Sequence, residues 1–136
     1  MELELLNIVS AKTTDPRERA DLEELRRYAM AVAEVEEEQV RQTGKHILSR
    51  AVLEDIEESE DARERVFIIQ SRFCERAESA SEAVASIIDF EREELQFLHL
   101  LADLASQSER SRLQPLIETK EQLVGGMENF LQTWAA

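Results

Sequence analysis

Two glutamates, Glu91 and Glu94, are the residues of this chain best placed to do chemistry. Each interrupts one of two adjacent apolar stripes on a predicted helix, so both lie on faces that otherwise look buried. The stripes are Val84, Ile88, Glu91, Leu95, Leu98, Ala102 and Ala105, and Ile87, Phe90, Glu94, Phe97, Leu101 and Leu104. A buried, unpaired carboxylate must take up a proton, pair with a cation or ligate a metal. Because the i, i+3 spacing lets both side chains converge on one point, the pair predicts a carboxylate site inside a helical protein.

A second predicted helix carries one glutamate in the same setting. Its apolar stripe is Leu22, Leu25, Ala29, Val32, Glu36 and Gln39. Residues 32–40 align with residues 87–95, and this alignment places Glu36 on Glu91. This internal sequence repeat indicates two related helix pairs, each of which contributes one glutamate to the interior.

Lys120 and Glu121, on a third predicted helix, could join this site. Lys120 interrupts the stripe Leu113, Leu116, Lys120, Leu123, Met127, Phe130 and Trp134. Its ammonium would pair with Glu91 or Glu94, an arrangement that fixes register more than it adds stability. Since one ammonium cannot balance Glu36 as well, one acid would be protonated, reach solvent, pair with an arginine or bind a cation. Glu121 lies close to the depth of Glu94 if the chain turns near residue 107 or 108. A metal site, a metal-free polar core and exposed acids remain open alternatives.

The elements that carry these residues are predicted to be helices throughout. The chain of 136 residues has 3 glycines and 2 prolines, and neither type occurs between Gly44 and Pro115, which leaves little room for strands and hairpins. Cap signals such as Asp15-Pro16 and Ser79-x-x-Glu82 mark helix starts. The predicted helices span 16–43, 59–78 with a preceding helical piece at 46–57, 81–105 and 111–134, after a short apolar lead-in at 1–14. Short connections between them predict one all-α domain over residues 1–136, an antiparallel four-helix bundle.

Composition excludes several classes of protein. The formal net charge of −14 is spread along the chain, so a nucleic acid backbone would be repelled. The single cysteine, Cys74, cannot form an internal disulfide, which is typical of a reducing compartment. No apolar run approaches the length of a spanning helix, and the first residues lack the pattern of a leader. We therefore expect a cytoplasmic protein that binds neither nucleic acid nor membrane.

The pattern Glu91-x-x-Glu94, followed by Phe97-Leu98 and then Leu101-Ala102, resembles the third helix of ferritin-like proteins, in particular the rubrerythrin branch. That resemblance implies a four-helix bundle with a di-iron site, to which two helices supply Glu and two supply Glu-x-x-His. It also implies iron oxidation or peroxide reduction. The metal ligands of this chain would then be Glu36 (or Glu34 or Glu37 in its place), Glu91, Glu94 and Glu121, and the metal would be iron or manganese.

The chain departs from that family pattern in its histidines. It contains no Glu-x-x-His, because His46 has Thr43 and His99 has Gln96 three residues earlier. The rubredoxin-type cysteine cluster is also missing. The resemblance therefore implies a degenerate or weak di-metal site, and di-iron oxidase or peroxidase chemistry only if activity survives.

A small acidic helical adaptor or export chaperone is the alternative function. Size, acidity and helical pattern fit it equally, and helix 111–134 is similar to the partner-binding helices of flagellar chaperones. A chaperone should leave the apolar face of that helix open, whereas a ferritin-like bundle buries it. A homodimer is also expected, through Leu123, Met127, Phe130 and Trp134.

Overall fold

The computed structural model describes residues 2–43, 65 and 67–135, and within them every regular element is an α-helix. The helices are α1 (Glu2–Lys12), α2 (Pro16–Thr43), α4 (Ala80–Leu104) and α5 (Gln107–Ala135), and residues 67–76 are helical as well. The prediction of an all-α chain is confirmed for this part. His46, the predicted piece at 46–57 and the start of the predicted helix at 59–78 lie outside the described residues.

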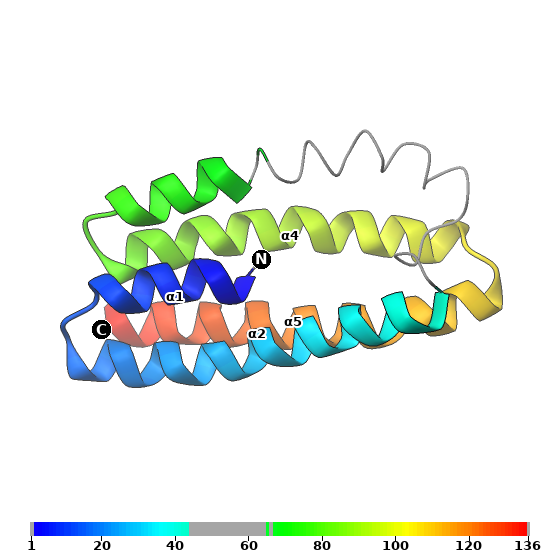
Figure 1. Ribbon diagram of the computed structural model, residues 1–136, viewed down its shortest axis with the longest axis horizontal. Helices are drawn as coiled ribbons and strands as arrows, with labels where there is room; N and C mark the ends of the chain where they lie inside the picture. Colours follow the sequence, from blue (N-terminus) through cyan, green and yellow to red (C-terminus); the bar gives the residue numbers. More distant parts are fainter. Residues whose placement is uncertain (1, 44–64, 66, 136) are drawn as a thin grey trace.

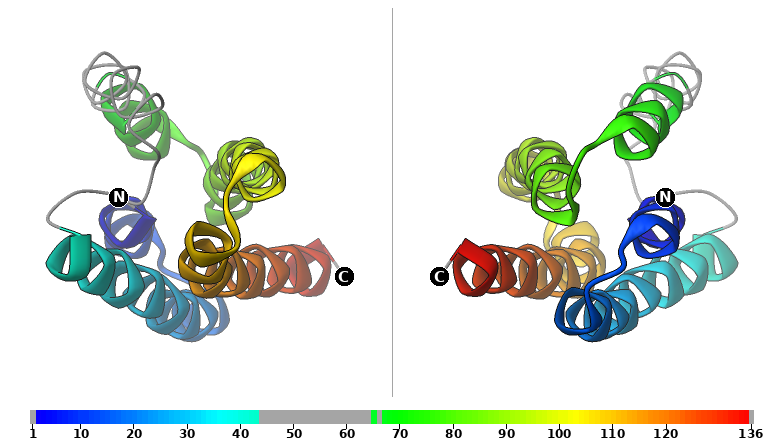
Figure 2. Two further views of the ribbon diagram at one scale, coloured as in Figure 1. Left: turned by 90° about the vertical axis from the view of Figure 1, so that its right-hand side faces the viewer. Right: turned by 90° about the vertical axis from the view of Figure 1, so that its left-hand side faces the viewer.

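Four helices surround one core in the order α1, α2, α5, α4. The last helix, α5, packs against α4 and α2, and α1 packs against the same two helices from the other side. Figure 2 shows this arrangement end on, with the 67–76 helix lying outside the four. The interior they share is therefore reached by side chains from all four elements. None of the described helices is long and apolar enough to cross a membrane.

The helix α1 occupies the segment that the sequence assigned only to an apolar lead-in. Its buried side chains are Glu2, Leu5, Leu6 and Val9, which follow the spacing of one helix face. The Thr13 hydroxyl donates to the Val9 carbonyl at 2.7 Å, and the Asp15 carboxylate caps α2 by accepting from the Arg17 amide at 2.8 Å. Because three residues suffice for this turn, α1 folds back along α2 and enters the core (Figure 1).

Serine caps set the starts of α4 and α5. Ser79 accepts a hydrogen bond from the Glu82 amide at 3.1 Å. At the start of α5, Ser106 and Glu109 form a reciprocal capping box, with both amide-to-side-chain distances at 3.4 Å. Ser111, where the predicted helix began, does not act as a cap, because its hydroxyl donates to the Gln107 carbonyl within the helix. Helix α5 therefore begins at Gln107 instead of residue 111, and Pro115 lies inside it instead of in its first turn.

The glycine pair in α5 marks a close helix contact and not a break. The helix continues through Gly125 and Gly126, although glycine lowers the stability of a helix interior. A Cβ added at Gly126 would lie 3.3 Å from side-chain atoms of both Leu25 and Tyr28 of α2. Helices α2 and α5 approach each other closely there because position 126 has no side chain.

Candidate functional site

The buried ammonium of Lys120, on α5, lies close to carboxylates on each of the helices α1, α2 and α4. The Nζ atom of Lys120, on α5, lies 2.8 Å from Glu94 and 3.3 Å from Glu91, both on α4. It lies 3.0 Å from Glu2 on α1 and 4.0 Å from Glu36 on α2. Lys120 and Glu91 are fully buried, Glu2 is nearly so, and Glu36 and Glu94 are partly exposed. We call these five residues the lysine–carboxylate cluster.

Glu91 is the carboxyl group of the cluster that is protonated. Burial, followed by the nearby Glu2 carboxylate, raises the pKa of Glu91 to about 9, although Lys120 acts in the opposite direction. Its Oε2 atom accepts a hydrogen bond from Lys120, whereas its Oε1 atom meets no donor. A proton on Glu91 turns that orphaned acceptor into a donor, and a hydrogen bond between Glu91 and Glu2 raises the pKa of Glu91 further. Glu91 is therefore neutral at pH 7.

Glu2 and Lys120 form the ionised pair at the centre of the cluster. Burial alone would raise the pKa of Glu2, but Lys120 and the hydrogen bond with Glu91 outweigh it, and the pKa falls to about 2. Burial would lower the pKa of Lys120, but Glu2, Glu91 and Glu94 hold it above its ordinary value. The pKa of Glu36 is raised, first by burial and then by Glu2. Lys120 therefore stays charged throughout the physiological range.

The residues of the cluster do not fit a di-metal centre while Lys120 is charged. Oxygens of Glu2, Glu36 and Glu94 lie within 4.8 Å of one another, a spacing at which three carboxylates could share a cation. The ammonium already fills that role, because it lies 3.0 Å from Glu2 and 2.8 Å from Glu94. A metal ion beside it would meet a fixed positive charge at short range. The cluster also lacks the histidines of a Glu-x-x-His site.

Of the four predicted ligands, Glu36, Glu91 and Glu94 lie together and Glu121 lies elsewhere. The Glu121 carboxylate is 3.1 Å from Nε2 of His99, and both side chains are more than half exposed. Glu121 follows Lys120 directly, so it projects about 100° further around the helix, away from the cluster. His99 likewise contacts a surface acid and none of the interior ones.

Glu2 is the member of the cluster that the sequence analysis missed. A signal for it was present, because Glu2 starts the stripe that continues with Leu5, Leu6 and Val9. An apolar stripe interrupted by one carboxylate is the pattern that singled out Glu91. Because the segment is short, its sequence predicted no helix there.

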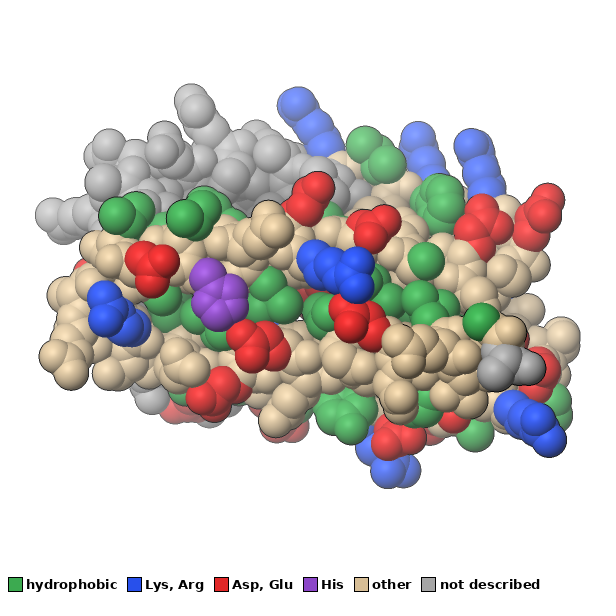
Figure 3. Space-filling model, turned by 180° about the vertical axis from the view of Figure 1, so that it is seen from behind, with side chains coloured by type: hydrophobic (Ala, Val, Ile, Leu, Met, Phe, Trp, Pro, Cys, Tyr) green, Lys and Arg blue, Asp and Glu red, His purple; other side chains and the backbone are tan. Residues whose placement is uncertain are grey.

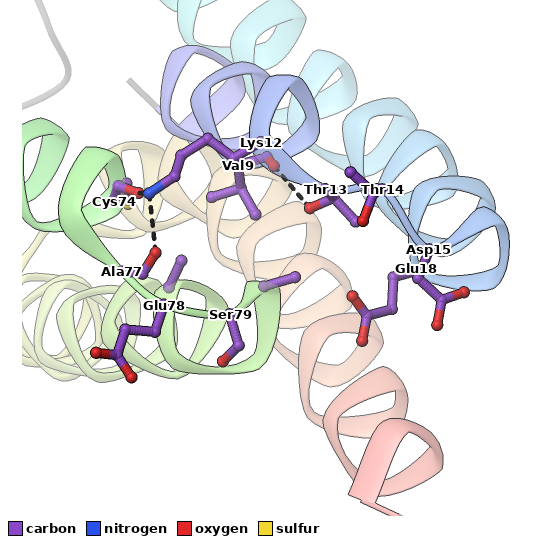
Figure 4. Close-up of a pocket in the computed structure, with 12 residues that line it drawn as sticks. Val9, Lys12, Thr13, Thr14, Asp15, Glu18, Cys74, Ala77, Glu78 and Ser79 are labelled. Carbon is purple, nitrogen blue, oxygen red and sulfur yellow. Dashed lines mark hydrogen bonds between the residues drawn. The ribbon is translucent and has the colours of Figure 1, made fainter.

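A second polar arrangement joins α1 to the 67–76 helix. The ammonium of Lys12 donates to the carbonyls of Cys74 at 3.2 Å, of Ala77 at 2.8 Å and of Glu75. These are the carbonyls left without partners at a helix C-terminus, so Lys12 acts as a cap supplied by another helix. Figure 4 shows Lys12 reaching across the rim of a pocket of about 200 Å³. Burial raises the pKa of the Cys74 thiol, which makes it a poor nucleophile. The arrangement is structural.

The apolar face of α5 is closed. Leu116, Lys120, Leu123 and Met127 are buried, and Phe130 and Leu131 are partly covered. The surface that the sequence suggested for a partner is thus occupied by the chain itself. The large apolar side chains that are exposed lie mainly on α4 and on the 67–76 helix: Ile68, Ile69, Phe73, Phe97, Leu100 and Leu104, with Met30 on α2.

Comparison with known proteins gives no relative from which a function could be transferred. No protein-family model matches the chain, and the searches of curated proteins and of solved structures found no match. What the chain does must therefore be inferred from its own side chains.

Proposed function

We propose that this protein is a rubrerythrin-like antiparallel four-helix bundle in which the Lys120 ammonium stands in place of metal ions, and that it acts by binding protein and not by catalysis. The observation that carries the proposal is the position of Lys120 Nζ, which lies within 3.3 Å of Glu2, Glu91 and Glu94. An internal cation of this kind satisfies the acids that would otherwise attract a metal.

The chemistry of the cluster supports the absence of catalysis. A metal centre that works on oxygen or peroxide needs an open coordination position, and the ammonium fills the space between the carboxylates. Titration does not free that space, because the pKa of Lys120 lies above its ordinary value. Glu91 is fully buried, so its carboxyl group is not accessible to a substrate from solvent.

A stripe on the outer face of α4 supports protein binding. Phe97, Leu100 and Leu104 follow an i, i+3, i+7 spacing, and they are 46%, 62% and 85% exposed. Single exposed apolar residues are ordinary, but three large ones on one helix face favour a surface that binds another protein. We call these three residues the α4 stripe. We assign partner binding to the α4 stripe, because the face of α5 that the sequence indicated for this role is buried.

Metal analysis of the wild-type protein and of a Lys120→Ala variant tests this proposal. We expect dialysed wild-type protein grown with added iron and manganese to retain fewer than about 0.1 ions per chain. Lys120→Ala removes the cation but keeps Glu2, Glu36 and Glu94, so Mn²⁺ should raise its melting temperature and leave that of the wild type unchanged. Glu121→Gln, outside the cluster, is the control. Retention of about two ions per wild-type chain, as in a di-iron protein, would overturn the proposal.

A further inference from the structure

We propose that the partner of this protein is a second copy of itself, held through the α4 stripe and the exposed face of the 67–76 helix in a twofold-symmetric dimer. This inference rests on the proposed function, since it names the partner that the binding surface takes. The two patches lie on the same chain and carry opposite charges along their edges, which is what a self-complementary interface requires.

The first patch is a basic and apolar face of the 67–76 helix. Ile69, Arg72, Phe73 and Arg76 follow the i, i+3, i+4, i+7 spacing of one helix face, and Ile69 is 66% and Phe73 41% exposed. They line most of a pocket of about 450 Å³ that continues to Glu82 on α4. Neither guanidinium has an ion-pair partner among the described residues. We call this the arginine face.

Arginines with no ion-pair partner in the part of the chain that the structure describes are unexpected at this composition. It has 30 acidic and 16 basic residues, so a surface arginine has many possible partners nearby. Arginine and aromatic side chains together are also the types enriched at protein interfaces. Figure 3 shows hydrophobic side chains along the upper part of one side of the molecule, and basic side chains that project beside acidic ones at the end where the 67–76 helix lies. The arginine face therefore fits an acidic, apolar surface.

The α4 stripe offers that surface. Exposed acids flank it: Glu93 lies one turn before Phe97, and Asp103 lies one turn after Leu100. Apolar residues on one patch can meet apolar residues on the other while arginines meet acids. In a twofold dimer each contact occurs twice, with the arginine face of either copy on the α4 stripe of its partner. A different acidic partner would cover the arginine face and leave the α4 stripe exposed.

A charge-swap experiment read by sedimentation equilibrium tests the interface. One variant carries Arg72→Glu with Arg76→Glu, and the other carries Glu93→Arg with Asp103→Arg. In either variant alone the two patches carry like charges, so we expect its dimer dissociation constant to rise more than about tenfold at physiological salt. An equimolar mixture restores opposite charges at both contacts, so a heterodimer should form. All four side chains are exposed, so helix content should not change, and Arg19→Glu on α2 is the matched control.

Each outcome decides the inference. A wild-type dimer that both variants weaken and the mixture restores supports it. A wild-type protein that stays monomeric at all concentrations overturns it, and so does a dimer that neither charge reversal affects. The metal content of the wild-type protein is measured independently of its oligomeric state, so failure of the dimer and failure of the proposed function are distinguishable.

Discussion

Burial disfavours the ionised form of every group in the lysine–carboxylate cluster. The groups nearest to each side chain determine whether it is charged. Lys120 keeps its proton because carboxylates from three helices surround it. Glu2 keeps its negative charge because Lys120 and a hydrogen bond from Glu91 outweigh its burial. Glu91 competes with Glu2 for the same ammonium and accepts a proton instead. The interior thus holds one strong ion pair and one neutral acid.

The raised pKa of Glu91 predicts a stability that falls as pH rises. Between the ordinary value of 4.5 and about 9, the folded state holds a proton that the unfolded state has released. The free energy of unfolding should therefore decrease across this range, by up to about 1.4 kcal/mol per pH unit from this group. Glu91→Gln keeps the neutral form at all pH values, so it should flatten the decrease. Urea unfolding between pH 5.5 and 8.5 measures both slopes.

The control for this prediction is Glu93→Gln, an exposed change two residues away on the same helix. It should leave the slope as it is in the wild type. Equal slopes for Glu91→Gln and the wild-type protein would contradict the assignment of Glu91 as the protonated acid.

At the scale of helices, the sequence periodicity predicted the features that depend on the residues of a single helix. The helices around Glu36 and Glu91 were predicted within a residue of their bounds, because long apolar stripes and caps fix them locally. The place of α1 was not predicted, since an 11-residue helix is marginal by itself and gains its order from packing on α2 and α4. Lys120 and Glu121 were both assigned inward, but adjacent residues on a helix cannot face one point.

The two adjacent glycines of α5 predict opposite responses to alanine. A Cβ at Gly125 meets nothing within 4 Å among the described residues, so Gly125→Ala should raise the free energy of unfolding by about 0.5–1 kcal/mol through helix propensity. A Cβ at Gly126 lies 3.3 Å from Leu25 and Tyr28, so the same gain there is offset by crowding. Gly126→Ala should be less stable than Gly125→Ala by about 1 kcal/mol in urea unfolding. Equal stability would indicate that α2 and α5 are not in close contact there.

At the scale of the molecule, Lys120 is the point where α5 is tied to α1, α2 and α4. Lys120→Met should lower the free energy of unfolding at pH 7 by about 3–5 kcal/mol, because it leaves the buried Glu2 without its ammonium counter-ion. The double variant Glu2→Gln with Lys120→Met removes both charges, so its loss should be smaller than the sum of the two single losses by about 0.5–3 kcal/mol. Chemical unfolding of the three variants gives this coupling. Simple additivity would show that the two groups do not interact.

The hydrogen bond between Glu2 and Lys120 joins residues 118 positions apart in the chain. Helical proteins usually fold through local contacts, but this one cannot be made until α5 has been synthesised. A growing chain therefore presents Glu2, Glu36, Glu91 and Glu94 while their counter-ion is still missing. Burying these acids without a cation costs free energy, so we expect the interior to close only once Lys120 is in place.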